Sequence, residues 1–254
     1  MNKVAYGTLI CITVFSIFSL AGCGTSKKEA LPKENPTDNL VAAKNSAKSA
    51  LDFMYKGKTS GLSNFTTSTP DDIKQMFVKY FEDRVSQTSS SENDQANNYF
   101  LILGGEKHSY NEIFKGYADT YYDQIKTIGD AKITDIKLSE NSQTANVTAT
   151  FKPIDSSSEL EPVEDARDKA FGGLDNRTIM RNSKSDNFLA INKMIQLKLY
   201  SVYYGDMGKI ANKAPDDVKI KFSMTKSGDH YDVSAENLMI LARFARNGIP
   251  PYSD

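Results

Sequence analysis

The chain has little cysteine, no tryptophan and no excess of charge of either sign. Its 254 residues include two cysteines, Cys11 and Cys23, both close to the N-terminus. The sequence after Cys23 therefore can form no internal disulfide. A region of about 215 residues does not need one, because a chain of that size can bury enough apolar surface to fold on its core alone.

The charge balance excludes one class of partner. Lysine and arginine number 31 against 32 acidic residues, which gives a formal net charge of −1. A domain that binds nucleic acid usually carries a clear basic excess. The composition therefore predicts no nucleic-acid partner.

Motifs for catalysis and metal binding are also missing. The two histidines, His108 and His230, stand in neither a His-x-Glu nor a His-x-x-x-His spacing, so we expect no metal site and no cofactor. No Gly-x-Ser-x-Gly elbow for a nucleophilic serine occurs. Neighbouring carboxylates such as Asp71 and Asp72 point in different directions on a helix and make poor acid–base pairs. The sequence predicts no catalytic residue, although a triad assembled only in space stays open.

The one long apolar run lies at the N-terminus. Residues 4–18 are mostly apolar, follow Lys3 and lead into Leu20-Ala21-Gly22-Cys23, after which the chain becomes polar at once. The run is shorter than the roughly 18 residues that a stable membrane span needs. The tetrapeptide resembles the lipobox of bacterial lipoprotein signal peptides.

This resemblance implies a processing route. The Cys23 thiol would receive a diacylglyceryl group, and a signal peptidase would cut between Gly22 and Cys23, which removes residues 1–22 as a signal peptide. Two acyl chains hold a protein durably on a membrane, whereas one does not. We therefore expect a lipoprotein anchored to the cell membrane on its extracytoplasmic face, with the N-terminal lipid as its contact with the membrane.

The rest of the chain divides into four predicted segments. Residues 23–37 are polar and broken by Pro32 and Pro36, which is typical of a flexible tether. We expect a first unit of helices and a β-hairpin over 38–152, a partly mobile connection over 153–185, and a second unit of helix, hairpin and helix over 186–254 that packs with the first.

Hydrophobic periodicity predicts the elements of these units. Apolar residues three and four apart indicate helices over about 38–56, 70–85 and 110–128, the last preceded by a Ser109–Glu112 capping box. Alternating residues indicate a hairpin over about 131–151 with a phase break at Thr134-Asp135.

The second half of the chain repeats this plan. A short helix over 162–171 precedes a long helix over about 186–211, a second hairpin over 218–235, and a last helix that Ser234 caps and Asn247-Gly248 ends. Helices on antiparallel hairpins predict an α+β fold, with two helix-plus-hairpin units as one arrangement.

The first unit also carries a loose family resemblance. An alanine-rich helix that ends in Phe53-Met54-Tyr55-Lys56-Gly57, the segment Gly61-Leu62-Ser63-Asn64-Phe65, and a helix start at Pro70-Asp71-Asp72 follow one another. This order resembles lipoproteins of unassigned activity from low-GC Gram-positive bacteria, which often carry a conical α+β domain similar to nuclear transport factor 2 and the cystatins. The resemblance covers residues 40–151 and implies no catalytic residue.

Tyrosines are the one group that could line a pocket, because each offers an apolar ring and a hydroxyl. Six recur at helical spacing: Tyr117, Tyr121, Tyr122, Tyr200, Tyr203 and Tyr204. A helix packed on a hairpin produces the same spacing, and core packing is the simpler interpretation. If a pocket exists, we expect it between these tyrosines and the hairpins.

Elimination then favours a tethered domain that binds or interacts without catalysis, with a small molecule, a peptide or an envelope protein as partner. A cell-envelope hydrolase is the first alternative. Capture of a solute for a transporter is another, but the chain lacks the alternating strands and helices of a two-lobed binding protein. A further alternative rests on residues 15–22, which resemble signalling peptides cut from the lipoprotein signal sequences of some Gram-positive bacteria.

Overall fold

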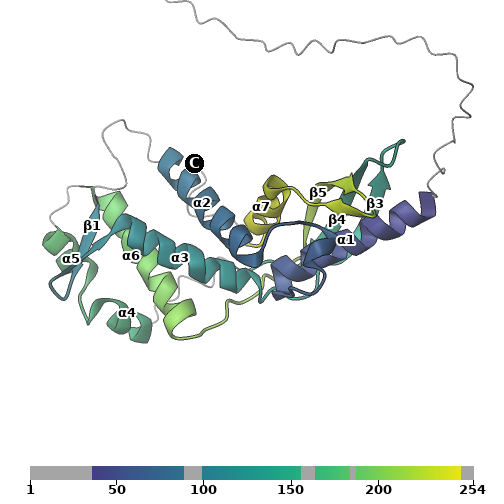
Figure 1. The fold of residues 1–254 in the computed structure, drawn as a ribbon. Coiled ribbons are helices and arrows are strands. Elements are labelled where there is room, and N and C mark those ends of the chain that lie inside the picture. The colour runs from purple at the N-terminus through teal and green to yellow at the C-terminus, as the bar shows by residue number, and fades with distance from the viewer. Residues whose placement is uncertain (1–35, 89–98, 156–163, 184–186, 247–254) are drawn as a thin grey trace, which may run out of the picture. The chain divides into compact units, whose positions relative to one another are not determined.

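The computed structural model describes residues 36–88, 99–155, 164–183 and 187–246. All of them belong to one compact unit, which spans Glu34–Asp254. The predicted signal peptide and most of the predicted tether lie outside the described residues. Helices and antiparallel strands make up the described part, which confirms the predicted α+β class (Figure 1).

Three helices of the first half match the periodicity of the sequence. They are α1 (Pro36–Lys56), α2 (Pro70–Thr88) and α3 (Tyr110–Ile125). Thr69 and Asp72 cap α2 reciprocally, since the Thr69 amide donates to the Asp72 carboxylate at 3.0 Å and the Asp72 amide donates to the Thr69 hydroxyl at 3.2 Å. Ser109 caps α3 by accepting from the Glu112 amide at 3.3 Å. Capping residues in the sequence therefore indicate where α2 and α3 begin.

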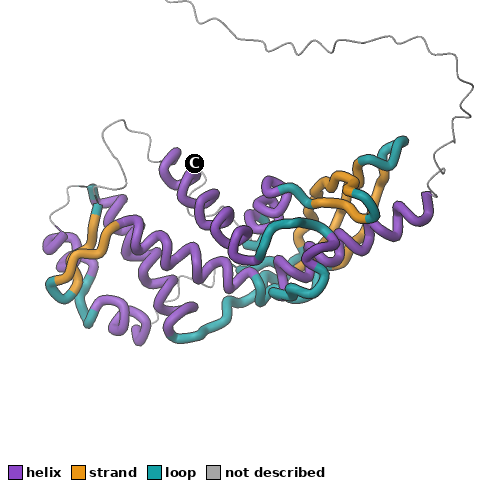
Figure 2. Tube along the Cα trace, in the orientation of Figure 1, coloured by secondary structure: helices purple, strands orange, loops and turns teal. Residues whose placement is uncertain are grey.

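A small hairpin precedes α3 and was not predicted. Its strands are β1 (Phe100–Leu103) and β2 (Glu106–Ser109), joined by Gly104 and Gly105, which both have positive φ. The strands pair with each other and form a sheet of their own, apart from the other strands (Figure 2). The alternation could not show it, because β2 is four residues long and carries no apolar side chain.

The main sheet has four antiparallel strands in the order β3-β4-β5-β6. They are β3 (Lys132–Leu138), β4 (Thr144–Phe151), β5 (Val218–Ser227) and β6 (His230–Asp232). The register shifts between Ile133 and Asp135, at the phase break seen in the sequence. The two predicted hairpins thus join through β4 and β5 into a single sheet.

Helices cover one face of this sheet. Alternate residues of β4 and β5 are buried, among them Val147, Phe151 and Phe222, while the residues between them are more exposed. Helix α1 contacts β3 and β6, and α7 (Ala235–Arg243) contacts β5. The predicted packing of helices on antiparallel hairpins is confirmed.

The predicted connection over 153–185 contains two helices, α4 (Glu164–Phe171) and α5 (Asn176–Ser183). The first was predicted and the second was not, because its eight residues are mostly polar around the buried Ile179. The mobility expected of this segment stays a prediction, as do the domain boundaries.

Two helix ends differ from the sequence-based prediction. The long helix is α6 (Phe188–Tyr200) and continues as a π-helical turn η4 (Ser201–Asp206), so it stops short of residue 211. Helix α7 ends at Arg243 instead of at Asn247-Gly248. In the second case the Ala245 amide donates to the Ala242 carbonyl, three residues back, at 3.2 Å, so the last turn is tighter and the α-helical bonding ends there.

We expect a truncated chain that begins at Asp38 to fold in water without lipid or oxidant. The tether contributes no apolar stripe, and no disulfide is available. Circular dichroism should show one cooperative thermal transition that a reducing agent does not change. Insolubility of this chain, or a transition that requires residues 24–37, would show that the tether belongs to the core.

Candidate functional site

The described residues contain a groove of about 800 Å³ beside α1. Its walls are residues 42–52 of α1, the loop 58–64 with the short helix η1 (Leu62–Asn64), and the turn at Asp229-His230 that leads into β6. The volume lies within the range of about 300–1,000 Å³ that is common for small-molecule sites. We therefore take this groove as the candidate ligand site.

Ser46 holds the three walls together. Its side chain is fully buried on α1, and its hydroxyl donates to the Asn64 carbonyl at 2.6 Å. The same hydroxyl accepts from the Tyr231 amide of β6 at 3.0 Å. One small polar side chain thus satisfies two backbone groups of segments that are far apart in the sequence, which fixes the loop over the helix.

A glycine allows the loop to approach α1 this closely. Gly61 has a φ of +88°, and a β-carbon there would lie 2.9 Å from the Ser49 hydroxyl. The Ser49 hydroxyl instead accepts from the Asn64 side-chain amide at 3.1 Å. The groove therefore depends on a backbone conformation that glycine adopts without strain.

The charged groups of the groove are paired with one another. Asp52 lies 2.5 Å from the Lys48 ammonium and 3.9 Å from the Lys58 ammonium. Burial raises the pKa of the Asp52 carboxyl, but hydrogen bonds to Lys48 and Lys56 outweigh that effect and bring it below its ordinary value.

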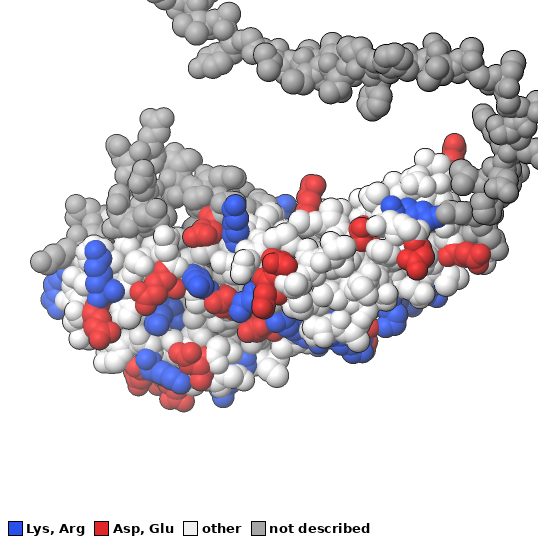
Figure 3. Space-filling model, in the orientation of Figure 1, with Lys and Arg blue, Asp and Glu red and all other residues white. Residues whose placement is uncertain are grey.

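The opposite wall carries a histidine between two carboxylates. The imidazole of His230 lies 3.1 Å from both Asp229 and Asp232. The hydrogen bond to Asp229, helped by the charge of Asp232, raises the pKa of His230, and the same bond lowers the pKa of Asp229. Both walls therefore present ionisable side chains that lie beside partners of opposite character. Figure 3 shows the same mixture over one face of the molecule, where basic and acidic side chains are interspersed.

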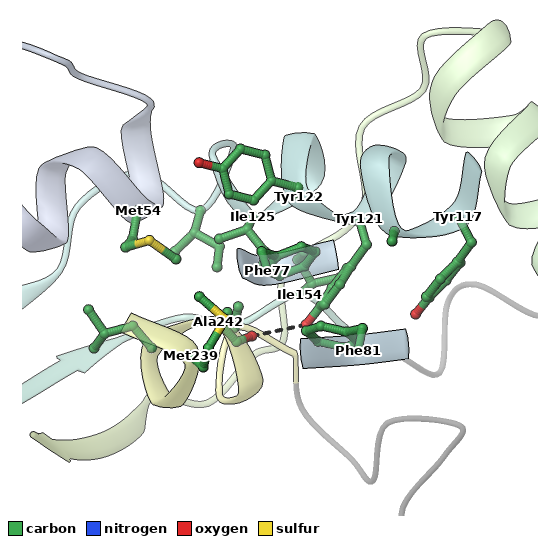
Figure 4. Close-up of a cluster of buried hydrophobic side chains, with 14 of the residues drawn as sticks. Met54, Phe77, Phe81, Tyr117, Tyr121, Tyr122, Ile125, Ile154, Met239 and Ala242 are labelled. Carbon is green, nitrogen blue, oxygen red and sulfur yellow. Dashed lines mark hydrogen bonds between the residues drawn. The ribbon is translucent and has the colours of Figure 1, made fainter. Parts of the chain in front are cut away.

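The structure joins five of the six predicted tyrosines through ring contacts, whereas the ring of Tyr122 contacts Phe77 of α2. None of the six lines the groove. Five are buried and Tyr203 is half-buried. The ring of Tyr117 lies 6.0 Å from Tyr121 and 4.8 Å from Tyr200, and the ring of Tyr204 lies 4.6 Å from Tyr200. Figure 4 shows Tyr117, Tyr121 and Tyr122 among other core side chains. The cluster is packed as a core between α3 and α6–η4, and the tyrosine pocket stays a prediction.

Two buried tyrosine hydroxyls have a structural role at the end of α7. Tyr121 donates to the Ala242 carbonyl at 3.2 Å, and Tyr55 donates to the Leu241 carbonyl at 2.9 Å. The last carbonyls of a helix lack the amide four residues ahead, so side-chain donors often bind them. The Tyr121 hydroxyl adds a donor to the Ala242 carbonyl, which also accepts from the Phe244 amide. Tyr121 therefore joins α3 to α7 and is not free to orient a ligand.

The tyrosines are also unsuited to acid–base chemistry. Burial, with a smaller effect of Asp123, raises the pKa of Tyr122 to about 12, and burial raises the pKa of Tyr204 to about 12. The pKa of Tyr121 is raised further, again because burial disfavours the phenolate. These phenols stay protonated at neutral pH and can only donate and accept hydrogen bonds.

Two other ionisable residues singled out in the sequence have local partners. Asp72 caps α2, and His108 on β2 lies 3.1 Å from Glu112. Within the described ranges, no group of three histidine, cysteine, aspartate or glutamate side chains converges as a metal site would require. None of the helices in these ranges combines the length and apolar character needed to cross a bilayer.

The predicted lipid-attachment residue Cys23 and the predicted cleavage residue Gly22 lie outside the described residues.

Comparison with known proteins assigns the chain to no family. No protein-family model matches the chain, and no curated protein matches it. One solved structure is similar, that of YcdA, a proposed lipoprotein of Bacillus subtilis, at 16% sequence identity and a TM-score of 0.45. The match covers 84% of this chain but 58% of that one. A TM-score below 0.5 does not establish a shared fold, and no nuclear transport factor 2 or cystatin fold is shown.

The sequence analysis did not predict the groove, although one feature of the sequence indicated part of it. The segment between α1 and α2 is a polar run with Gly57 and Gly61, which marks a loop with special backbone geometry. The turn at Asp229-His230, which borders the same groove, lies more than 160 residues away in the sequence. No local pattern could therefore indicate that the two segments meet.

Proposed function

We propose that the chain is a lipoprotein tethered to the outer face of the cell membrane, whose folded domain binds a ligand without catalysis. The tether is supported by Leu20-Ala21-Gly22-Cys23 after a short apolar run, since only a thiol at this place can form the thioether to diacylglycerol. The binding role is supported by the groove along α1, which has the volume of a ligand site and polar groups that converge from three segments.

We expect Cys23→Ser to abolish lipidation and to move the protein out of the membrane fraction, because an alcohol does not form the thioether. Metabolic labelling with a clickable fatty acid measures this. Cys11→Ser is the matched control, since it removes the other thiol and should keep the label. Continued labelling of the Cys23→Ser variant would contradict the lipobox assignment.

The binding role is tested by a ligand screen. A thermal-shift assay should find a compound that raises the melting temperature of the domain, since a ligand that binds only the folded state stabilises it by mass action. A screen in which the domain instead converts a cell-envelope substrate, and a single carboxylate substitution removes that turnover with the fold intact, would support the hydrolase alternative.

A further inference from the structure

We propose that the groove along α1 recognises a neutral, hydroxyl-rich ligand such as a linear oligosaccharide. This proposal rests on the binding role above and names the chemistry of its ligand. Two observations support it. Some polar side chains of the groove have no hydrogen-bond partner within the described part of the chain, and the walls lack the features that peptides and other ligand classes need.

The available hydrogen-bonding groups are neutral. Among the described residues, Asn45, Ser60 and Ser63 line the groove with exposed side chains that make no hydrogen bond to the rest of the chain. Hydroxyl and carboxamide groups both donate and accept, which matches the paired donor and acceptor character of a sugar hydroxyl.

A charged ligand fits less well because the charges of the lining balance, with Lys48 and Lys58 against Asp52 and Asp229. The Lys48 ammonium and the His230 imidazole each lie against carboxylates of the same walls. An anion or a cation meets no net charge of opposite sign in this lining, and exposed pairs such as these contribute little by themselves. A neutral ligand can bind without breaking them.

The usual ways of recognising a peptide are not available here. The edge of β6 does not offer free amides at Tyr231 and Val233, because they donate to the Ser46 hydroxyl and to the Phe65 carbonyl at 2.8 Å. Ala42 is the one apolar side chain in the lining, and the lining contains no phenylalanine, tyrosine, tryptophan or arginine. Addition of a strand, burial of an apolar helix face, docking of a proline-rich segment and recognition by an arginine cluster each need one of these features.

The lining also excludes two other ligand classes. An apolar small molecule would find polar side chains on every wall. A nucleobase would find a single aromatic ring, the His230 imidazole, and that ring already lies between Asp229 and Asp232. A hydroxyl-rich chain remains, held by hydrogen bonds to Asn45 on α1 and to Ser60 and Ser63 on the loop. Without a tyrosine or tryptophan ring to stack on, we expect its affinity to be modest.

The test uses the full lipidated chain in lipid nanodiscs and isothermal titration calorimetry. The probes are the β-1,4-linked tetramers of glucose and of N-acetylglucosamine, with tetra-alanine as the peptide probe and tripolyphosphate as the anionic probe. We expect at least one tetrasaccharide to bind with a Kd between about 10 µM and 1 mM, and the other two probes to bind at least tenfold more weakly.

Variants locate the site. Asn45→Ala combined with Ser63→Ala should weaken tetrasaccharide binding about tenfold, because it removes two hydrogen-bonding groups. Thr67→Ala combined with Asn111→Ala is the matched control, since it removes two exposed polar groups outside the groove and should leave Kd unchanged.

Each other outcome overturns the proposal and shows whether the ligand class or the location is wrong. Binding of tetra-alanine or tripolyphosphate alone, lost in the groove variant, would refute the ligand class and leave the binding domain in place. Tetrasaccharide binding that the groove variant does not weaken would refute the location. A folded chain that binds none of the probes refutes the hydroxyl-rich ligand, whereas the ligand screen decides the binding role separately.

Discussion

Replacing Tyr121 with alanine is expected to lower the free energy of unfolding by about 3–5 kcal/mol, as other large-to-small changes of buried aromatic residues do. The side chain is 2% exposed, and its ring lies 5.4 Å from Phe81 and 5.8 Å from Phe77. Its hydroxyl also donates to the Ala242 carbonyl at the end of α7. Urea denaturation of the truncated domain measures the loss.

Tyr121→Phe separates the two contributions. It keeps the ring and removes the hydroxyl, so it should cost about 0.5–1.5 kcal/mol. Tyr203→Ala, which truncates the half-buried member of the group, should cost less than Tyr121→Ala. A Tyr121→Ala variant as stable as the parent chain would show that this residue does not belong to the core and would favour the tyrosine pocket.

The second large effect is expected at Ser46. Ser46→Ala should destabilise the domain by about 2–4 kcal/mol, because it leaves the Asn64 carbonyl and the Tyr231 amide without their partner inside the protein. It should also detach the loop 58–64 from α1 and weaken any ligand of the groove. Urea denaturation and hydrogen exchange of the loop amides measure the two consequences.

Ser49→Ala is the matched control for this prediction. Ser49 lies one turn further along α1 and lines the same groove, but its hydroxyl accepts from the partly exposed side chain of Asn64. Its loss leaves no backbone group unsatisfied, so the change in stability should stay within about 0.5 kcal/mol. Equal losses for the two variants would mean that Ser46 does not tie the walls together.

Much of the fold could be predicted because its elements are long and their two faces differ. Ala145, Val147, Ala149 and Phe151 alternate with polar residues along β4, and this pattern alone identifies a strand with one buried face. Ser109 and Ser234 marked the starts of α3 and α7 through a capping chemistry that is local in the sequence.

The rest could not be predicted because its cause is not local. The π-helical turn after Tyr200 has no residue signature, and Gly205 within it lies against Thr120 of α3, so the packing of two helices bears on it. The hairpin of β1 and β2 is too short for a period to show. The groove is the hardest of these features to predict, because Ser46 and Tyr231 come into contact only in the folded chain.

The tyrosines illustrate how one pattern allows two interpretations. Helical spacing of aromatic residues on α3 and α6–η4 is compatible with a pocket wall and with a packed core. The ring contacts, and the Tyr121 hydroxyl that donates to the end of α7, support the core. The site therefore has to be sought where polar groups converge around open space, which is the groove beside α1.

The most direct test of this account is to map where a ligand binds. The backbone amide resonances of the truncated domain are recorded by NMR with and without the compound that gives the largest thermal shift. We predict that the largest chemical-shift changes fall on Asn45, Ser60 and Ser63 and on the turn at Asp229-His230. Changes confined to Tyr200, Tyr203 and Tyr204 would contradict the assignment of the groove as the ligand site.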